Sequence, residues 1–266
     1  MTGAGPGGPA APFDRAAVRR HRDRAAARVD QVADLLGELA ERLLDRLDDT
    51  TQRFTAALDL GGRGVVAPLL AARGIGCVSC DLSAPMVARN PRPVVVADEE
   101  FLPFAPGSFD LVVASLSLHW INDLPGTLIQ LRHALRPGGL LLASLPALGT
   151  LGGLRMALTR AEVAVSGGAA PRVAPFPDLS DCAALLQRAG YALPVADVED
   201  VGFSYANPMT LVAELRAAGE TNALAERDRR IPPRGLFAAG FADAAGADGR
   251  VSVRLRLAVL TGWAPG

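Results

Sequence analysis

The chain has 266 residues, half of which are apolar, and this is enough for one large α/β domain with a buried core. Its formal net charge of −1 argues against a nucleic-acid-binding protein. An odd number of only three cysteines gives no disulfide framework and is typical of the reducing cytoplasm, where we expect the protein to act. No apolar run reaches the roughly 18 residues that a membrane-spanning helix needs.

The N-terminal segment divides into a tail and a helical region. Residues 1–12 are rich in glycine, proline and alanine, which predicts a disordered tail, and we expect a single domain over 13–266. Residues 14–49 have apolar side chains at helical spacing. Six arginines and one aspartate fall between positions 15 and 28, which favours a solvent-exposed helix face over a specific anion site. A peripheral contact with a membrane surface or an acidic partner is the remaining alternative for this basic helix.

Short apolar runs then alternate with helical segments, a pattern typical of a parallel sheet with helices on both faces. Right-handed crossovers make such a sheet doubly wound and Rossmann-like. We expect its strands at 54–60, 76–81, 93–98, 108–118 and 140–146, with helices between them at 65–74, 83–90 and 124–135.

The C-terminal part, 147–266, begins with helical segments and a Gly/Pro-rich loop. A strand candidate at 194–205 is followed by a mostly helical stretch at 208–247, and a strictly alternating run at 249–265 predicts the last strand. We therefore expect a seven-stranded sheet around a core at 54–146. Its last two strands should form an antiparallel edge pair, with a helical insertion before the last strand.

Acidic residues close three consecutive predicted strands, at the edge where doubly wound sheets bind their ligands. Asp59 lies at the end of the first strand, Asp81 ends the second and Asp98 ends the third. Glycines after the first strand allow close backbone approach to a ligand, and an acid ending the second strand can accept from both hydroxyls of a ribose. An acid after the third strand can accept from an exocyclic amine. Together these features predict a site for an adenosine-bearing ligand.

Four segments resemble the motifs of the class I S-adenosylmethionine-dependent methyltransferases, both in their residues and in their order along the chain. The segments are LDLGGRG at 58–64, CDLSAPMV at 80–87, ADEEFLPFAPGSFDLVVASLSLHWIND at 97–123 and LRPGG at 135–139. The resemblance implies S-adenosyl-L-methionine as cofactor, with the first loop on its methionine part, the second-strand acid on the ribose and the third-strand acid on the adenine amine. The residues that it assigns to the cofactor are Asp59, Gly61, Gly62, Gly64, Asp81, Leu82, Asp98, Glu99 and Ser115.

A narrower resemblance extends over most of the chain, through FDRAAVRRHRDRAA near the start, SLHWINDLPG, PRVAPFPD, AAGETN and the closing TGWAP. These segments resemble the complex I assembly factor that hydroxylates an arginine, together with its α-proteobacterial relatives. More distantly, they are similar to the malonyl-carrier-protein methyltransferase of biotin synthesis. The resemblance implies a bacterial enzyme whose partner is a protein substrate, such as a respiratory complex I subunit, or a carrier protein.

The glycine loop departs from the family's pattern, which reads Asp-x-Gly-x-Gly-x-Gly. Aligned without a gap, Arg63 and Val65 stand where glycines are usual. Alternatively, one residue is missing between Gly61 and Arg63, and Gly64 is the last glycine of the loop. In either alignment, the Arg63 side chain points outward or forms a salt bridge with the cofactor's carboxylate.

His119 and Trp120 follow the fourth strand and are the candidate catalytic residues. His119 is either a base or part of the pocket wall, and Trp120 either stacks on a ligand or belongs to the core. Glu220 and Asn222 either form a helix-ending turn or line the substrate side. The Cys-x-x-Cys pair at 77–80 lies in a predicted strand without a second pair, and the three scattered histidines form no metal triad, so we expect no metal.

No nucleophile motif is visible, and a methyltransferase needs none. The sulfonium methyl of its cofactor is already activated, so the protein must position the acceptor and exclude water. We expect an enzyme of the complex I assembly type that acts on a protein. The alternatives are hydroxylation of an arginine in a complex I subunit, methylation of a malonyl carrier protein, and a non-catalytic assembly chaperone with a decayed cofactor site.

Overall fold

The structure, a computed structural model, describes residues 11–233 and 235–266. Residues 1–10 of the predicted tail lie outside these ranges. The strands are β1 (Ala56–Leu60), β2 (Gly76–Asp81), β3 (Val94–Val96), β4 (Phe109–Ser115), β5 (Leu135–Pro146), β6 (Ala192–Tyr205) and β7 (Val251–Trp263). The helices are α1 (Arg15–Ala25), α2 (Ala33–Leu44), α3 (Val66–Ala72), α4 (Ala84–Val87), α5 (Leu124–Ala134), α6 (Gly152–Ser166), α7 (Leu179–Arg188), α8 (Pro208–Ala217) and α9 (Leu236–Ala244).

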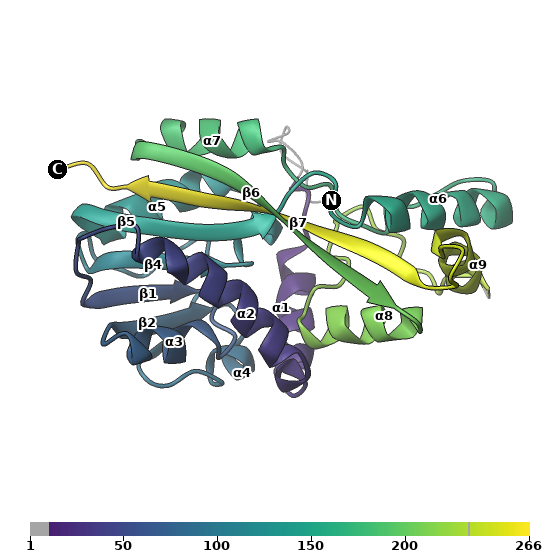
Figure 1. Cartoon of the computed structure of the whole chain (residues 1–266), viewed down its shortest axis with the longest axis horizontal. Helices are drawn as coiled ribbons and strands as arrows, with labels where there is room; N and C mark the ends of the chain where they lie inside the picture. The colour runs from purple at the N-terminus through teal and green to yellow at the C-terminus, as the bar shows by residue number, and fades with distance from the viewer. Residues whose placement is uncertain (1–10, 234) are drawn as a thin grey trace, which may run out of the picture.

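The strands form one seven-stranded sheet in the order β3-β2-β1-β4-β5-β7-β6 (Figure 1). Strands β1 to β5 pair in parallel, whereas β7 is antiparallel to both β5 and β6. This confirms the predicted doubly wound sheet and its antiparallel pair at one edge. The order reverses between β1 and β4, and such a reversal opens a crevice at the carboxyl ends of the strands.

Helices cover both faces of the sheet, and alternate strand residues meet different helices. Leu111 of β4 packs in a cluster with Leu43 of α2 and Leu70 of α3. Its neighbour Val112 faces the other side and packs in a cluster with Leu128 of α5. Helix α7 adds Cys182 and Leu186 to this second cluster, and α2 runs diagonally across the first face in Figure 1. Strands buried on both faces explain the nearly continuous apolar runs of the sequence.

The helical region predicted at 14–49 is two α-helices with different partners. Helix α1 ends at Ala25, and α2 begins at Ala33 after a short 3₁₀ turn at Val29–Val32. Helix α2 packs on the sheet face, whereas α1 lies beyond the carboxyl ends of β1 and β2, beside α8 (Figure 1). One straight helix could not cover both surfaces, so the chain turns between them.

The last two strands continue past the rest of the sheet as a two-stranded ribbon. Strand β7 pairs with β5 only over 257–263, but with β6 from Val251 onward. Helices α6 and α9 pack against the far end of this ribbon (Figure 1). The stretch predicted as mostly helical at 208–247 consists of α8 and α9, with 218–233 non-helical between them. Among the described helices, none is long and apolar enough to cross a bilayer.

Candidate active site

The acids at the ends of β1, β2 and β3 come together at the carboxyl edge of the sheet, as predicted. Asp59 lies opposite Ser79 of β2, and Asp81 lies opposite Val96 of β3. Asp59 and Asp81 are both buried, and Ser79 Oγ donates to Asp59 Oδ2 at 3.0 Å. Burial, together with the neighbouring charge of Asp81, raises the pKa of Asp59 to about 7. The edge therefore gathers carboxyl groups that need cationic or hydroxyl partners.

The glycine turn after β1 is packed tightly against the protein itself. Gly61 has a φ of +75°, and its amide and that of Gly62 donate to the Cys80 carbonyl at 2.7 and 3.2 Å. A Cβ at Gly61 would lie 2.3 Å from Ser117 Cβ, and one at Gly62 would lie 2.7 Å from Asp59 Oδ2. Glycine is required here for close packing between β1, β2 and the end of β4.

Arg63 points into the space between the strand ends. Its side chain is 3% exposed, and its Nη2 donates to the Leu116 carbonyl and, at 2.5 Å, to Glu220 Oε1. Burial and the nearby charge of Arg22 together lower the pKa of this guanidinium to about 10. Of the two orientations predicted for Arg63, the outward one is wrong. Its guanidinium lies beside Leu116, just after the end of β4.

Glu220 lies in the insertion before the last strand, and its side chain reaches the residues that follow β4. Its Oε2 accepts from Trp120 Nε1 and lies within hydrogen-bond distance of His119 Nε2, both at 2.7 Å. Although burial opposes ionisation, His119 and Arg63 hold the pKa of Glu220 well below its usual range. Asn222 makes the predicted turn, since its Oδ1 accepts from the Leu224 amide at 3.0 Å, and its Nδ2 donates to the Pro171 carbonyl. The backbone of Glu220 forms the predicted helix-ending turn, since its amide donates to the Leu215 carbonyl at 2.8 Å after Gly219 at a φ of +80°, while its side chain is a partly buried anion.

Two arginines of α1 form ion pairs with the carboxylates at the ends of β2 and β3. Arg22 Nη1 lies 3.3 Å from Asp81 Oδ2, with both side chains at most 1% exposed. Arg15 Nη2 pairs with Asp98 Oδ1 at 2.5 Å and also with Glu99. The expectation of a solvent-exposed arginine face is wrong for these two residues. Their spacing of seven along the helix places both on its buried face.

Arg15 and Arg22 share their buried stripe with Val18 and Ala25. A helical pattern that alternates arginine with apolar residues in this way is the sequence signal that could have identified them. The pattern is weak, because burial of an arginine depends on a carboxylate that another segment provides.

The remaining predicted site residues lie in or beside the same region. Leu82 is buried in a cluster with Trp120, and Ser115 is half-buried at the end of β4. Trp120 packs edge-on against Phe13 with ring centroids 5.3 Å apart, so it belongs to the core as well as binding Glu220. The Gly64 amide donates to Asn90 Oδ1 at 2.9 Å. The catalytic role of His119 and Trp120 stays a prediction.

Cys77 and Cys80 both lie in β2, in the strand predicted for them. Burial raises the pKa of both Cys77 and Cys80 to about 12, which leaves their thiols protonated and unreactive. Over 11–233 and 235–266, no group of three or more histidine, cysteine or acidic side chains is arranged to hold a metal ion.

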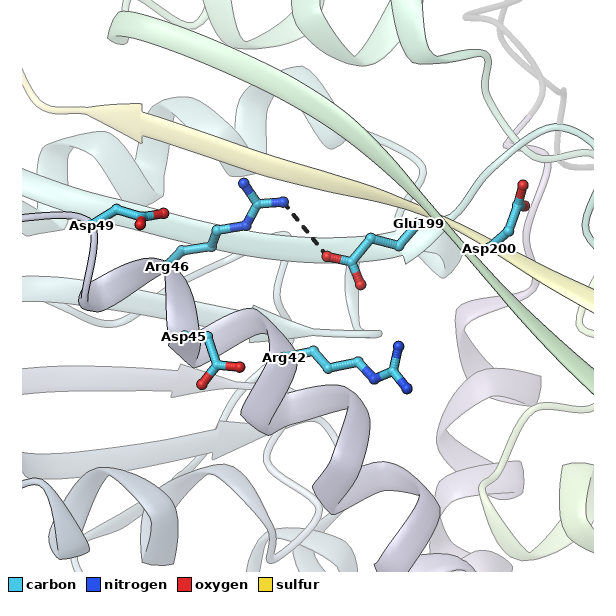
Figure 2. Close-up of a pocket in the computed structure, with 6 residues that line it drawn as sticks. All are labelled: Arg42, Asp45, Arg46, Asp49, Glu199 and Asp200. Carbon is cyan, nitrogen blue, oxygen red and sulfur yellow. Dashed lines mark ion pairs between the residues drawn. The ribbon is translucent and has the colours of Figure 1, made fainter.

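A separate pocket lies between α2 and β6, away from the strand ends. Figure 2 shows Arg46, in the 3₁₀ turn at Asp45–Leu47 that follows α2, reaching toward Glu199 of β6, at 3.5 Å. Arg46 also pairs with Asp197 at 3.0 Å. The lining is entirely charged and contains no residue of the glycine turn, so this pocket is not the adenosine site.

Comparisons with known proteins agree with this geometry. A family model described as a methyltransferase domain matches residues 58–143. The zebrafish (Danio rerio) protein named arginine-hydroxylase NDUFAF5, mitochondrial, is 33% identical over 268 residues, which cover 95% of this chain and 83% of the relative. The chain belongs to the class I S-adenosylmethionine-dependent methyltransferase family. This methyltransferase is also 34% identical, over 95% of its length and 89% of the relative, to the malonyl-[acyl-carrier protein] O-methyltransferase of Xylella fastidiosa.

The fold of the methyltransferase matches solved structures as well. The YcgJ protein of Bacillus subtilis superposes with a TM-score of 0.59 at 13% identity, covering 84% of this chain and 98% of that one. At this level of identity the match supports the fold alone.

The methyltransferase uses S-adenosyl-L-methionine, and the chemistry of the strand-end residues suits this cofactor. Asp81 ends β2, where an acid can accept from ribose hydroxyls, and Asp98 and Glu99 follow β3. In this conformation, however, arginine side chains of the protein already hold the groups that the cofactor would contact. Asp81, Asp98 and Glu99 are each paired with an arginine of α1, and the Arg63 side chain lies beside the glycine turn. The cofactor therefore cannot reach these carboxylates while α1 stays in place.

Proposed function

We propose that this methyltransferase-family enzyme modifies an arginine side chain of a protein substrate, as an assembly factor of respiratory complex I acting in the bacterial cytoplasm. Support comes from relatives named arginine-hydroxylase NDUFAF5 that match 94–95% of the chain at 33–34% identity. The match includes α1 and the insertion around Glu220, which lie outside the methyltransferase domain at 58–143.

The proposal rests on the acceptor groups that surround the Arg63 guanidinium. The partly buried carboxylate of Glu220 and the carbonyl of Leu116 accept from it, and His119 and Trp120 lie beside the same carboxylate. A carboxylate and a carbonyl are the acceptors that a planar guanidinium requires. A substrate arginine could take the place of Arg63 at the end of β4, next to the predicted cofactor site.

A malonyl group would need different surroundings. Its free carboxylate is an anion and would be repelled by Glu220, which is held ionised by its neighbours. The basic groups of this region, Arg22 and Arg63, already face carboxylates at the strand ends. Next to Glu220, the electrostatics thus favour a cationic side chain over a malonyl carboxylate.

The bound cofactor supplies an activated methyl group, and the residues around Glu220 would hold and orient the substrate. Whether the arginine receives a methyl group or an oxygen atom is what the test below decides. The proposal concerns the substrate side chain and its recognition.

The test is a gene deletion complemented with variants. Arginine-containing peptides of complex I subunits are compared by mass spectrometry between the wild type, the deletion, and strains that carry Glu220→Gln or Glu162→Gln. Glu162 is the matched control because it is also a buried carboxylate paired with an arginine, Arg172, but it lies in α6. We expect one arginine to lose the mass of a methyl group or an oxygen in the deletion and with Glu220→Gln, and to keep it with Glu162→Gln.

Unchanged arginine masses in the deletion strain, together with intact complex I, would refute the proposal. Biotin auxotrophy of the deletion strain would instead assign the enzyme to malonyl-carrier-protein methylation. Loss of complex I without any change in an arginine mass would indicate the chaperone alternative.

A further inference from the structure

The arginines at the strand ends leave an unusual number of hydrogen-bonding atoms unused. Nine buried side-chain nitrogen or oxygen atoms lack a partner within the described residues, and six of them belong to this one region. They are Nε of Arg15, Nε of Arg22, Nε and Nη1 of Arg63, Oγ of Ser117 and Nδ1 of His119.

Buried polar groups in folded proteins are nearly always satisfied. Here, a cluster of mostly N–H donors is buried together without enough acceptors. These donors are free to bind a ligand that carries acceptor atoms, and a carboxylate is one such group. The closed arrangement is therefore internally incomplete, although each arginine has at least one acidic partner.

Helix α1 holds this arrangement shut from one side. Arg22 covers Asp81, Arg15 covers Asp98 and Glu99, and Ser83 Oγ at the start of α4 donates to Asp23 Oδ1 of α1 at 2.6 Å. The ion pairs occupy the carboxylates that the ribose and the adenine amine of the cofactor would use.

The N-terminal end of α1 is joined to the segment that carries Glu220. The Asp14 amide donates to the Ala223 carbonyl at 2.8 Å, and Phe13 forms an isolated β-bridge with Leu224. Asp14 also caps α1 and accepts from Arg227 at 2.9 Å. Helix α1 and residues 220–225 therefore form one connected cover over the strand ends.

We propose that α1 is a latch on the cofactor site, in which Arg22 and Arg15 occupy the cofactor's carboxylates until S-adenosyl-L-methionine displaces them. Release of Asp81 makes it available to the ribose. The unused N–H groups of Arg63, which lies outside α1, then have an acceptor in the carboxylate of the cofactor. The inference rests on the family cofactor and not on the arginine substrate proposed above.

The test is a binding measurement with S-adenosylhomocysteine, which needs no protein substrate. Arg22→Met removes the latch pair and leaves Asp81 uncompensated in the closed form, so the closed form is weakened relative to the bound form. We expect the dissociation constant measured by calorimetry to fall by about tenfold or more. Arg19→Met, on the exposed side of the same helix, is the matched control and should leave the dissociation constant unchanged.

Hydrogen exchange of the unmodified protein gives a second measure that does not depend on folding of a variant. Saturating S-adenosylhomocysteine should increase amide exchange over 15–25, because α1 loses its ion pairs to the strand ends. Equal or weaker binding by Arg22→Met would refute the latch, as would increased protection of 15–25 on binding. Loss of arginine modification in cells with these binding results intact would refute only the proposed substrate.

Discussion

Replacement of Glu220 by glutamine tests the buried network at its centre. The Glu220 carboxylate contacts Arg63, His119 and Trp120, all at 2.5–2.7 Å. Glutamine keeps the shape but removes the charge, and its NH₂ group turns a donor toward one of these donors. Arg63, at 3% exposure, loses its close anionic partner.

The expected loss in the free energy of unfolding arises because the Arg63 guanidinium stays buried without its anionic partner. Removing one member of a buried ion pair typically costs about 3–5 kcal/mol, and the 17% exposure of the Glu220 side chain places the value near the lower end, at about 3 kcal/mol. For a chain of this length, this corresponds to a fall in Tm of roughly 6–12 °C.

Urea denaturation followed by tryptophan fluorescence measures both the stability and the local change. Trp120 donates to Glu220, whereas Trp263 stacks on Phe54 with centroids 6.5 Å apart. The native emission spectrum should therefore change in Glu220→Gln. Glu162→Gln breaks the Arg172 pair in α6 and should lower the free energy of unfolding while leaving that spectrum unchanged.

A double-mutant cycle measures the energetic coupling between Glu220 and Arg63. In an Arg63→Met background, the Glu220→Gln change should cost much less, because no buried guanidinium is left without a partner. A loss below about 1 kcal/mol in the single variant, or equal losses in both backgrounds, would show that Glu220 and Arg63 are not energetically coupled.

Three other variants test the neighbouring groups. Asp59→Asn should reduce the decline in stability between about pH 4 and pH 7, since a carboxyl whose pKa is raised to about 7 by burial destabilises the fold as pH rises, by up to about 4 kcal/mol. Gly61→Ala should destabilise by about 3 kcal/mol through its clash with Ser117, and Ser117→Gly should recover part of that loss. Asp81→Ala, made with Arg22→Met so that the latch is absent, should weaken S-adenosylhomocysteine binding about ten- to a hundredfold, or about 1.5–3 kcal/mol, by calorimetry.

Each of these expectations has a contrary outcome. Parallel stability curves for Asp59→Asn and the wild type across this pH range would show that Asp59 is ionised throughout. Wild-type stability of Gly61→Ala would show that the turn has room for a side chain. Unaltered affinity after Asp81→Ala would place the ribose elsewhere.

The sheet could be predicted because its signals are local. Apolar runs end at Asp59, Asp81 and Asp98, and parallel pairing brings those ends together whatever the side chains beyond them do. The break at 26–28 in the N-terminal helical region was not predicted, because it depends on where the sheet and its edge lie relative to each other.

The closed state of the site could not be predicted because its contacts are distant in sequence. Arg22 meets Asp81 59 positions away, and Arg63 meets Glu220 157 positions away. The helical spacing of Arg15 and Arg22 with apolar residues is only a weak sign of burial, because the carboxylate partners come from other segments. Glu220 was recognised as a candidate by resemblance, but its role as the shared anion of the network depends on three separate segments.

The contacts between α1 and the insertion affect how the protein folds during its synthesis. Asp14 binds Arg227, 213 residues later in the chain, so the cover that α1 forms with residues 220–225 cannot be complete until both segments have been synthesised. Until then, Arg15 and Arg22 can hold α1 on the strand ends only through Asp81, Asp98 and Glu99. The cofactor site of a nascent chain should therefore be closed less firmly than that of the finished protein.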